Sequence, residues 1–109
     1  MTTDVREICR NALAEFGSGH QIDKAKEELF ELGAALSHYT EGRASLNDVR
    51  TEIADVLIMA SQLALLFGEQ EVTNEMERKL GRLSDRLGMH RENPKLEPVA
   101  TNIDYYYGG

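Results

Sequence analysis

The sequence of 109 residues contains no tryptophan, only two prolines and a single cysteine. One cysteine cannot form a disulfide within the chain, so we expect a fold without crosslinks and a reducing, cytoplasmic environment. The scarcity of proline, together with abundant Leu, Ala and Glu, favours helix. Hydrophobic residues make up 41% of the chain and charged residues 28%. This composition is typical of a globular protein and excludes wholesale disorder.

The chain also lacks an excess of basic residues and a long hydrophobic run. Its formal net charge of -7 argues against nucleic-acid binding, which needs a basic surface. The first residues show neither the basic start nor the apolar run of a signal peptide. The longest apolar stretch, 56–67, is interrupted by Ser61 and Gln62 and is shorter than the ~20 residues that span a bilayer. We therefore expect a protein that contacts neither membranes nor nucleic acids.

Apolar residues recur at intervals of three and four in four segments, which predicts four helices. Their expected ranges are about 2–16, 21–39, 45–67 and 70–87. A turn is expected at 17–19, where the Gly-Lys-Ser/Thr of a P-loop is missing. Residues 1–89 are thus predicted to form one all-α domain, a helical bundle. The remaining residues, 90–109, show no period, and we expect an extended or partly disordered tail.

The third predicted helix is apolar nearly all round, which indicates burial on more than one side. A domain of this size has few layers, so we interpret the second apolar side as a subunit interface. Ser45, followed three residues later by Asp48, resembles a capping box at the start of this helix, with Asp in place of Glu.

Two pairs of acidic residues repeat one geometry on the second and third predicted helices. In each pair the two acids are three residues apart and therefore share a helix face, beside an apolar stripe. Carboxylates near apolar surface are costly unless a cation meets them, and a set of oxygen ligands suits Mg²⁺ or Mn²⁺. The alternative is a solvated helix face, which we prefer for most other acids of the chain. The four candidate metal ligands are Glu28, Glu31, Glu52 and Asp55.

Other metals fit the ligand set less well. Di-iron bundles place a His three residues after a Glu, and no His here follows a Glu at that spacing. Zinc favours His and Cys, and the one Cys lies on the apolar face of the first helix. On the fourth predicted helix, Lys79, Arg82 and Arg86 form a basic flank. These side chains would bind the outer oxygens of a triphosphate, or else pair with neighbouring acids.

The acidic pairs and their surroundings resemble the all-α nucleoside triphosphate pyrophosphatases of the MazG-like group. The resemblance covers about 21–87 and rests on Glu27-Glu28-x-x-Glu31, Glu52-x-x-Asp55 and the downstream Lys79 and Arg86. It implies that Glu28, Glu31, Glu52 and Asp55 bind magnesium and that Glu27 is an additional catalytic acid. It further implies hydrolysis of a nucleoside triphosphate to monophosphate and pyrophosphate, as in nucleotide-pool housecleaning, by a homodimer or homotetramer. In such an enzyme Gln21 or Asn74 would contact the base.

Two other functions are compatible with the sequence. An acidic helical bundle with an exposed apolar side would also serve as a binding or adaptor module for a basic partner. A degenerate relative would bind nucleotides as a sensor without hydrolysing them, although all four expected ligands are present. Magnesium dependence separates the first alternative from the enzyme, because only a metal site is stabilised by the ion.

Overall fold

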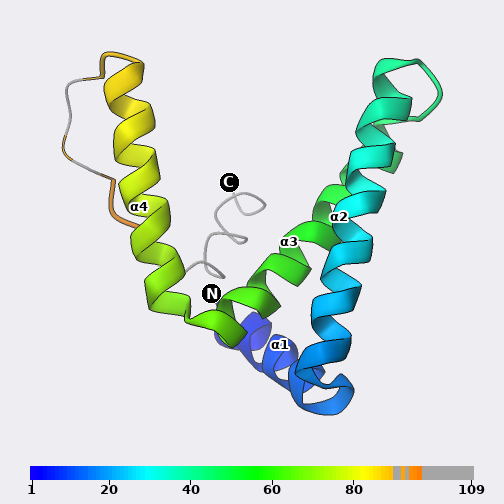
Figure 1. Ribbon diagram of the computed structural model, residues 1–109, viewed down its shortest axis with the longest axis horizontal. Helices are drawn as coiled ribbons and strands as arrows, with labels where there is room; N and C mark the ends of the chain where they lie inside the picture. The colour runs from blue at the N-terminus through cyan, green and yellow to red at the C-terminus, as the bar shows by residue number, and fades with distance from the viewer. Residues whose placement is uncertain (90–91, 93, 97–109) are drawn as a thin grey trace.

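A computed structural model describes residues 1–89, 92 and 94–96, and all regular structure in these residues is helical. The predicted tail, 90–109, lies outside the described residues except for 92 and 94–96. Four helices follow one another along the chain with short connections (Figure 1). They are α1 (Thr3–Phe16), α2 (Ser18–Thr40), α3 (Leu46–Phe67) and α4 (Glu69–Arg86).

The helices α2 and α3 form a hairpin, which is the main packing unit of the molecule (Figure 1). Helix α1 lies near the open end of this hairpin and packs on both of its helices. Helix α4 does not join the hairpin along its length, because the chain bends by 116° between α3 and α4. It runs away from α2 and forms a second arm, so the molecule is V-shaped and not a closed four-helix bundle (Figure 1).

The helix boundaries follow from local capping. The hydroxyl of Ser45 accepts a hydrogen bond from the Asp48 backbone N–H at 3.0 Å, and the Asp48 carboxylate accepts one from the Ser45 N–H at 2.8 Å. This reciprocal pair confirms the predicted capping box of α3. The predicted turn at 17–19 is wrong, since α2 begins at Ser18. Gly17 alone separates α1 from α2, with a φ of 89° that disfavours other residues.

Only part of the apolar stripe of α2 is covered. Ala25 is buried and Ile22 and Leu32 are half-buried. The other buried residues of α2 are polar, Gln21 and Glu28. Leu29 and Phe30 remain 55% and 79% exposed. Glu28 therefore lies within the α2/α3 interface, whereas Glu52 is half-buried and Glu31 is exposed.

Apolar side chains exposed on the described residues are numerous for a chain of this size. A helix of 18 residues such as α4 is marginal in water unless its apolar side is covered. The described residues thus leave substantial apolar area for a partner. The exposed large hydrophobic residues of the hairpin are Leu29, Phe30, Leu36, Tyr39, Leu46, Ile53, Ile58 and Phe67.

No single helix among the described residues is both long and apolar enough to cross a membrane. Only α3 and α4 taken together reach that length and hydropathy, and the 116° bend separates them.

The capping box gives a direct test of the start of α3. Replacing Ser45 by Ala removes the hydrogen bond to the Asp48 N–H, and we expect the free energy of unfolding to fall by about 1 kcal/mol. Urea unfolding at neutral pH, followed by circular dichroism, measures the change. The control is Ser37→Ala on the exposed part of α2, which should shift stability by less than about 0.5 kcal/mol. Equal effects of the two substitutions would contradict the role of the cap.

Candidate metal centre

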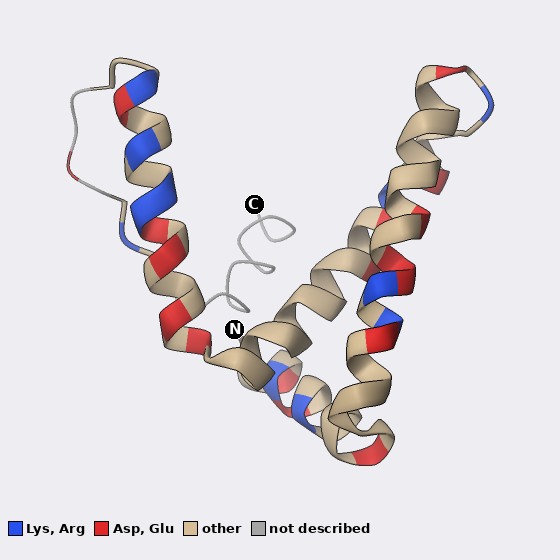
Figure 2. Ribbon diagram, in the orientation of Figure 1, with Lys and Arg blue, Asp and Glu red and all other residues tan. Residues whose placement is uncertain are grey.

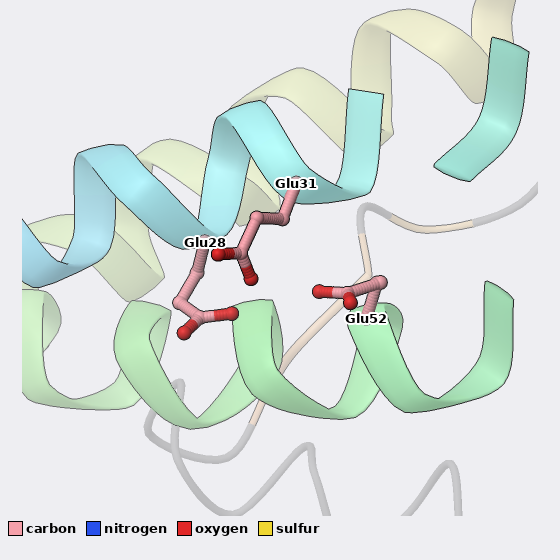
Figure 3. Close-up of side chains that lie close together, drawn as sticks. All are labelled: Glu28, Glu31 and Glu52. Atoms are coloured by element: carbon pink, nitrogen blue, oxygen red, sulfur yellow. The ribbon is translucent and has the colours of Figure 1, made fainter. Parts of the chain in front are cut away.

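Three of the four predicted metal ligands converge between α2 and α3. Glu28 and Glu31 come from successive turns of α2, and Glu52 comes from α3 (Figure 3). One carboxylate oxygen from each lies within 4.8 Å of the others. The side chains reach into the space between the two helices, so the hairpin itself fixes their separation (Figure 3). The arrangement confirms that the spacing in the sequence brings these three acids together.

Burial leaves two oxygens of this cluster unsatisfied. The side chain of Glu28 is only 8% exposed, and its Oε1 lies 3.2 Å from the Lys24 Nζ. Among the described residues, the Oε2 atoms of Glu28 and Glu52 are buried without a hydrogen-bond partner. A buried polar group without a partner costs about 1–3 kcal/mol, and a charged one costs more. Such atoms are the ones that a bound cation would satisfy.

The three carboxylates of the cluster repel one another. The neighbouring Glu28 carboxylate raises the pKa of Glu31, and partial desolvation and Glu52 act in the same direction. Lys24 relieves part of this repulsion, and its hydrogen bond to Glu28 raises the pKa of the lysine. Lys24 lies on α2, one turn before Glu28, where it reaches Oε1 of that residue. One ammonium against three carboxylates leaves the cluster with a negative excess.

The donor set and spacing fit a hard divalent cation. In an octahedral Mg²⁺ site each oxygen lies about 2.1 Å from the metal, so opposite oxygens are about 4.2 Å apart. The three carboxylate oxygens are spread over a similar distance, at most 4.8 Å. They would supply part of such a shell and leave the other positions to water and ligand. The cluster contains no His or Cys, which argues against zinc.

The other two acids of the motif lie outside this group of converging oxygens. Asp55 is half-buried on α3, one turn beyond Glu52, and is not one of the three residues whose oxygens converge. Glu27 is exposed, as expected from its place on α2, and its carboxylate lies 3.6 Å from the Lys24 Nζ. The assignment of Asp55 as a ligand and of Glu27 as a catalytic acid stays a prediction.

The two residues expected to contact a base, Gln21 and Asn74, form hydrogen bonds with other side chains. Gln21 is buried between α2 and α3, where its Nε2 donates to Oε1 of Gln62 at 2.7 Å. Asn74 is exposed on α4, and its Oδ1 accepts a hydrogen bond from Gln70 at 2.9 Å. Gln21 therefore connects the two helices of the hairpin, two turns before Glu28, and Asn74 lies on the other arm.

The predicted phosphate ligands also lie on the other arm. Lys79, Arg82 and Arg86 are exposed on the second half of α4, which diverges from the hairpin (Figure 2). The acids of α2 and α3 are on the opposite arm of the V (Figure 2). The fold thus separates these cations from the acidic cluster of the same chain. Their contact with a phosphate at that cluster would require a second copy of the chain.

Sequence reasoning missed two residues next to the cluster, His38 and Arg43. Both line a pocket that also includes Glu31 and Glu52. His38 follows Glu31 by seven residues, so the helical period alone puts the two on one face of α2. Arg43 carried no such signal, because it lies in the connector between α2 and α3, whose conformation the sequence does not specify.

Comparison with family models, curated proteins and solved structures gave no match for this chain. The fold and the site define an all-α protein with a carboxylate cluster between the two helices of a hairpin.

Magnesium should stabilise the folded protein through this cluster. An ion that binds only the folded state adds about 2.7 kcal/mol when its concentration is 100 times its Kd. We expect the Tm to rise with added MgCl₂ but not with NaCl at equal ionic strength, in a thermal unfolding scan. Glu28→Gln should remove the increase, and it should not lower the Tm of the metal-free protein, because it also removes repulsion.

The matched control is Glu15→Gln, an exposed acid on α1 that lies outside the cluster. It should keep the full magnesium response. A magnesium response that Glu28→Gln leaves intact would place the ion elsewhere.

Proposed function

We propose that this protein is a magnesium-dependent nucleoside triphosphate pyrophosphohydrolase of the MazG-like kind. The observation that carries the proposal is the buried Glu28 carboxylate, whose Oε2 has no partner among the described residues although two further carboxylates lie beside it. A surface cluster of acids would be solvated and would need no ion. In this cluster Glu28 is buried, Glu52 is half-buried and Glu31 is exposed, so desolvation of Glu28 adds to the repulsion among the three carboxylates. A divalent cation would offset both.

The residues of the cluster have defined tasks in such a reaction. Glu28, Glu31 and Glu52 would hold Mg²⁺, with Asp55 as the further ligand that the sequence motif predicts. The ion supplies Lewis-acid polarisation of phosphoryl oxygens and lowers the pKa of water. Hydrolysis joins a water oxygen to the α-phosphorus and breaks the bond from that phosphorus to the bridging oxygen. The bridging oxygen leaves with the electron pair as pyrophosphate, and the proton passes to a carboxylate of α2.

A nucleoside triphosphate is the substrate class that the charges favour. The cluster is negative, so a polyanion binds there only through the metal, and polyphosphates are the common biological ligands of Mg²⁺. Removal of unwanted nucleotides is the housecleaning role that the sequence resemblance implies. Gln21, the residue expected to contact the base, is hydrogen-bonded to Gln62. The preferred base and sugar are therefore identified by assaying separate nucleotides.

The same proposal includes an oligomer, a homodimer or homotetramer. Large apolar side chains of α2 are exposed, among them Leu29, Phe30 and Leu36. An interface of standard size buries ~800 Å² per partner, and the exposed large hydrophobic residues of α2 and α3 offer apolar surface for such a contact. A second copy would also cover α4 and bring Lys79, Arg82 and Arg86 of one chain to the hairpin of the other.

Activity is tested with purified protein, MgCl₂ and a panel of canonical and damaged nucleoside triphosphates, by measuring pyrophosphate release. We expect pyrophosphate and monophosphate in equal amounts, and loss of activity with EDTA. Glu52→Gln keeps the shape of the side chain and removes its charge, so turnover should fall by at least ~100-fold. Glu15→Gln should keep wild-type turnover. Release of inorganic phosphate in place of pyrophosphate, or no release from any triphosphate, would refute the assignment.

Oligomerisation is tested by sedimentation velocity across a range of protein concentrations. The wild-type chain should sediment as a dimer or tetramer, and Leu29→Lys should shift it towards monomer because it puts a charge in the apolar stripe. Lys26→Ala, a charge removed from an exposed position of the same helix, is the control and should leave the assembly unchanged. A wild-type monomer at all concentrations would contradict the proposed assembly.

A further inference from the structure

A pocket of about 380 Å³ lies directly beside the acidic cluster, at the closed end of the α2/α3 hairpin. Glu31 and Glu52 line one end of it, so cluster and pocket are continuous. His38 and Arg43 line the pocket as well, one from the last part of α2 and the other from the connector. The remaining lining residues of α2 are small, Ala34 and Ala35, which leaves the space open.

The pocket continues from the cluster towards the connector, whereas Lys24 lies on the other side. Lys24 precedes Glu28 by one turn of α2 and already pairs with its Oε1 at 3.2 Å. Glu31, Ala35 and His38 follow one another at spacings of four and three, so they form one face along α2. A chain of phosphates held at the cluster therefore has room to extend along this face.

Three carboxylates line the pocket, those of Glu31, Glu52 and Asp48, so an anion would enter it only with a cation bound at the cluster. Of the described residues that line it, Arg43 alone has a fixed positive charge. Its guanidinium pairs with Glu41, but Glu41 does not line the pocket and both side chains are more than half exposed. An exposed pair of this kind is easily exchanged for a charge-assisted bond to phosphate.

The third acid that lines the pocket is Asp48, whose carboxylate already accepts a hydrogen bond from the backbone. Its carboxylate accepts the hydrogen bond from the Ser45 N–H at 2.8 Å, and this backbone donor lowers the pKa of Asp48. Asp48 therefore attracts a further cation only weakly. Its negative charge is also partly compensated by the positive end of the helix dipole at the start of α3.

We propose that this pocket binds the two outer phosphates of the triphosphate, the group that leaves as pyrophosphate, with Arg43 and His38 as the donors. The proposal rests on the function proposed above and assigns the phosphate contacts to the chain that holds the metal ligands. The nucleoside would then lie outside the pocket. Arg43 would meet the negative charge that grows on the leaving group.

The test uses inorganic pyrophosphate as the probe, because it binds without any turnover. Isothermal titration with MgCl₂ present compares wild-type protein with Arg43→Gln, and we expect affinity for pyrophosphate to fall about tenfold, as for loss of a charge-assisted hydrogen bond. Arg43→Lys keeps the charge but loses the planar fork, so part of the affinity should return. Arg50→Gln, an exposed arginine of α3 outside the pocket, should bind like wild type.

A second readout is the steady-state kinetics of the same variants. Arg43→Gln should change kcat/KM by the same factor for every triphosphate that the protein hydrolyses, since the outer phosphates are common to all. Circular dichroism checks that the variants are folded, and Arg43→Lys serves if the glutamine variant is not.

The outcomes separate this proposal from the function on which it rests. If Arg43→Gln and Arg43→Lys change neither hydrolysis nor the affinity for pyrophosphate, the phosphate pocket is refuted and the proposed enzymatic function stands. Weaker binding of nucleoside monophosphate, with unchanged pyrophosphate binding, puts the nucleoside in the pocket and also overturns it. If the wild-type protein binds pyrophosphate through Arg43 but hydrolyses no triphosphate, the phosphate pocket stands and the proposed enzymatic function is refuted.

Discussion

The repulsion among three carboxylates inside one helical hairpin is the constraint on which the rest of this structure depends. Packing of α2 on α3 buries Glu28 and brings Glu31 and Glu52 within 4.8 Å of it. A hairpin that only needed stability would turn its apolar stripe inward and leave these acids in water. Here Glu28 is buried, Glu52 is half-buried and Glu31 is exposed, while Leu29 is left more than half exposed. The three carboxylates thus form a negatively charged site between the two helices.

The same arrangement leaves large apolar side chains of α2 exposed. Because the inner face of α2 is used for Gln21, Ala25 and Glu28, its leucine stripe is available for another surface. Helix α4 leaves the hairpin at a bend of 116°. In the proposed function the metal site and the assembly are linked, because the same orientation of α2 buries Glu28 and leaves Leu29 exposed.

Much of this structure could be predicted from local sequence, but the relation between helices could not. Ser45 and Asp48 marked the start of α3, and the i, i+3 spacing put Glu28 beside Glu31, because both signals act within one or two turns. Which face of α2 meets α3 depends on long-range packing, which a periodic stripe does not specify. The direction of α4 depends on the φ of 117° at Gly68, a conformation that the sequence allows without requiring. Arg43 lines the pocket because of the conformation of the connector, which local sequence signals do not specify.

The central claim, a divalent-metal site made by Glu28, Glu31 and Glu52, is tested most directly by titrating the protein with Mn²⁺ and measuring the free ion by electron paramagnetic resonance. The account predicts saturable Mn²⁺ binding that Mg²⁺ displaces and that Glu28→Gln and Glu52→Gln each weaken strongly. Absence of binding at millimolar Mn²⁺, or binding that both substitutions leave unchanged, would contradict it.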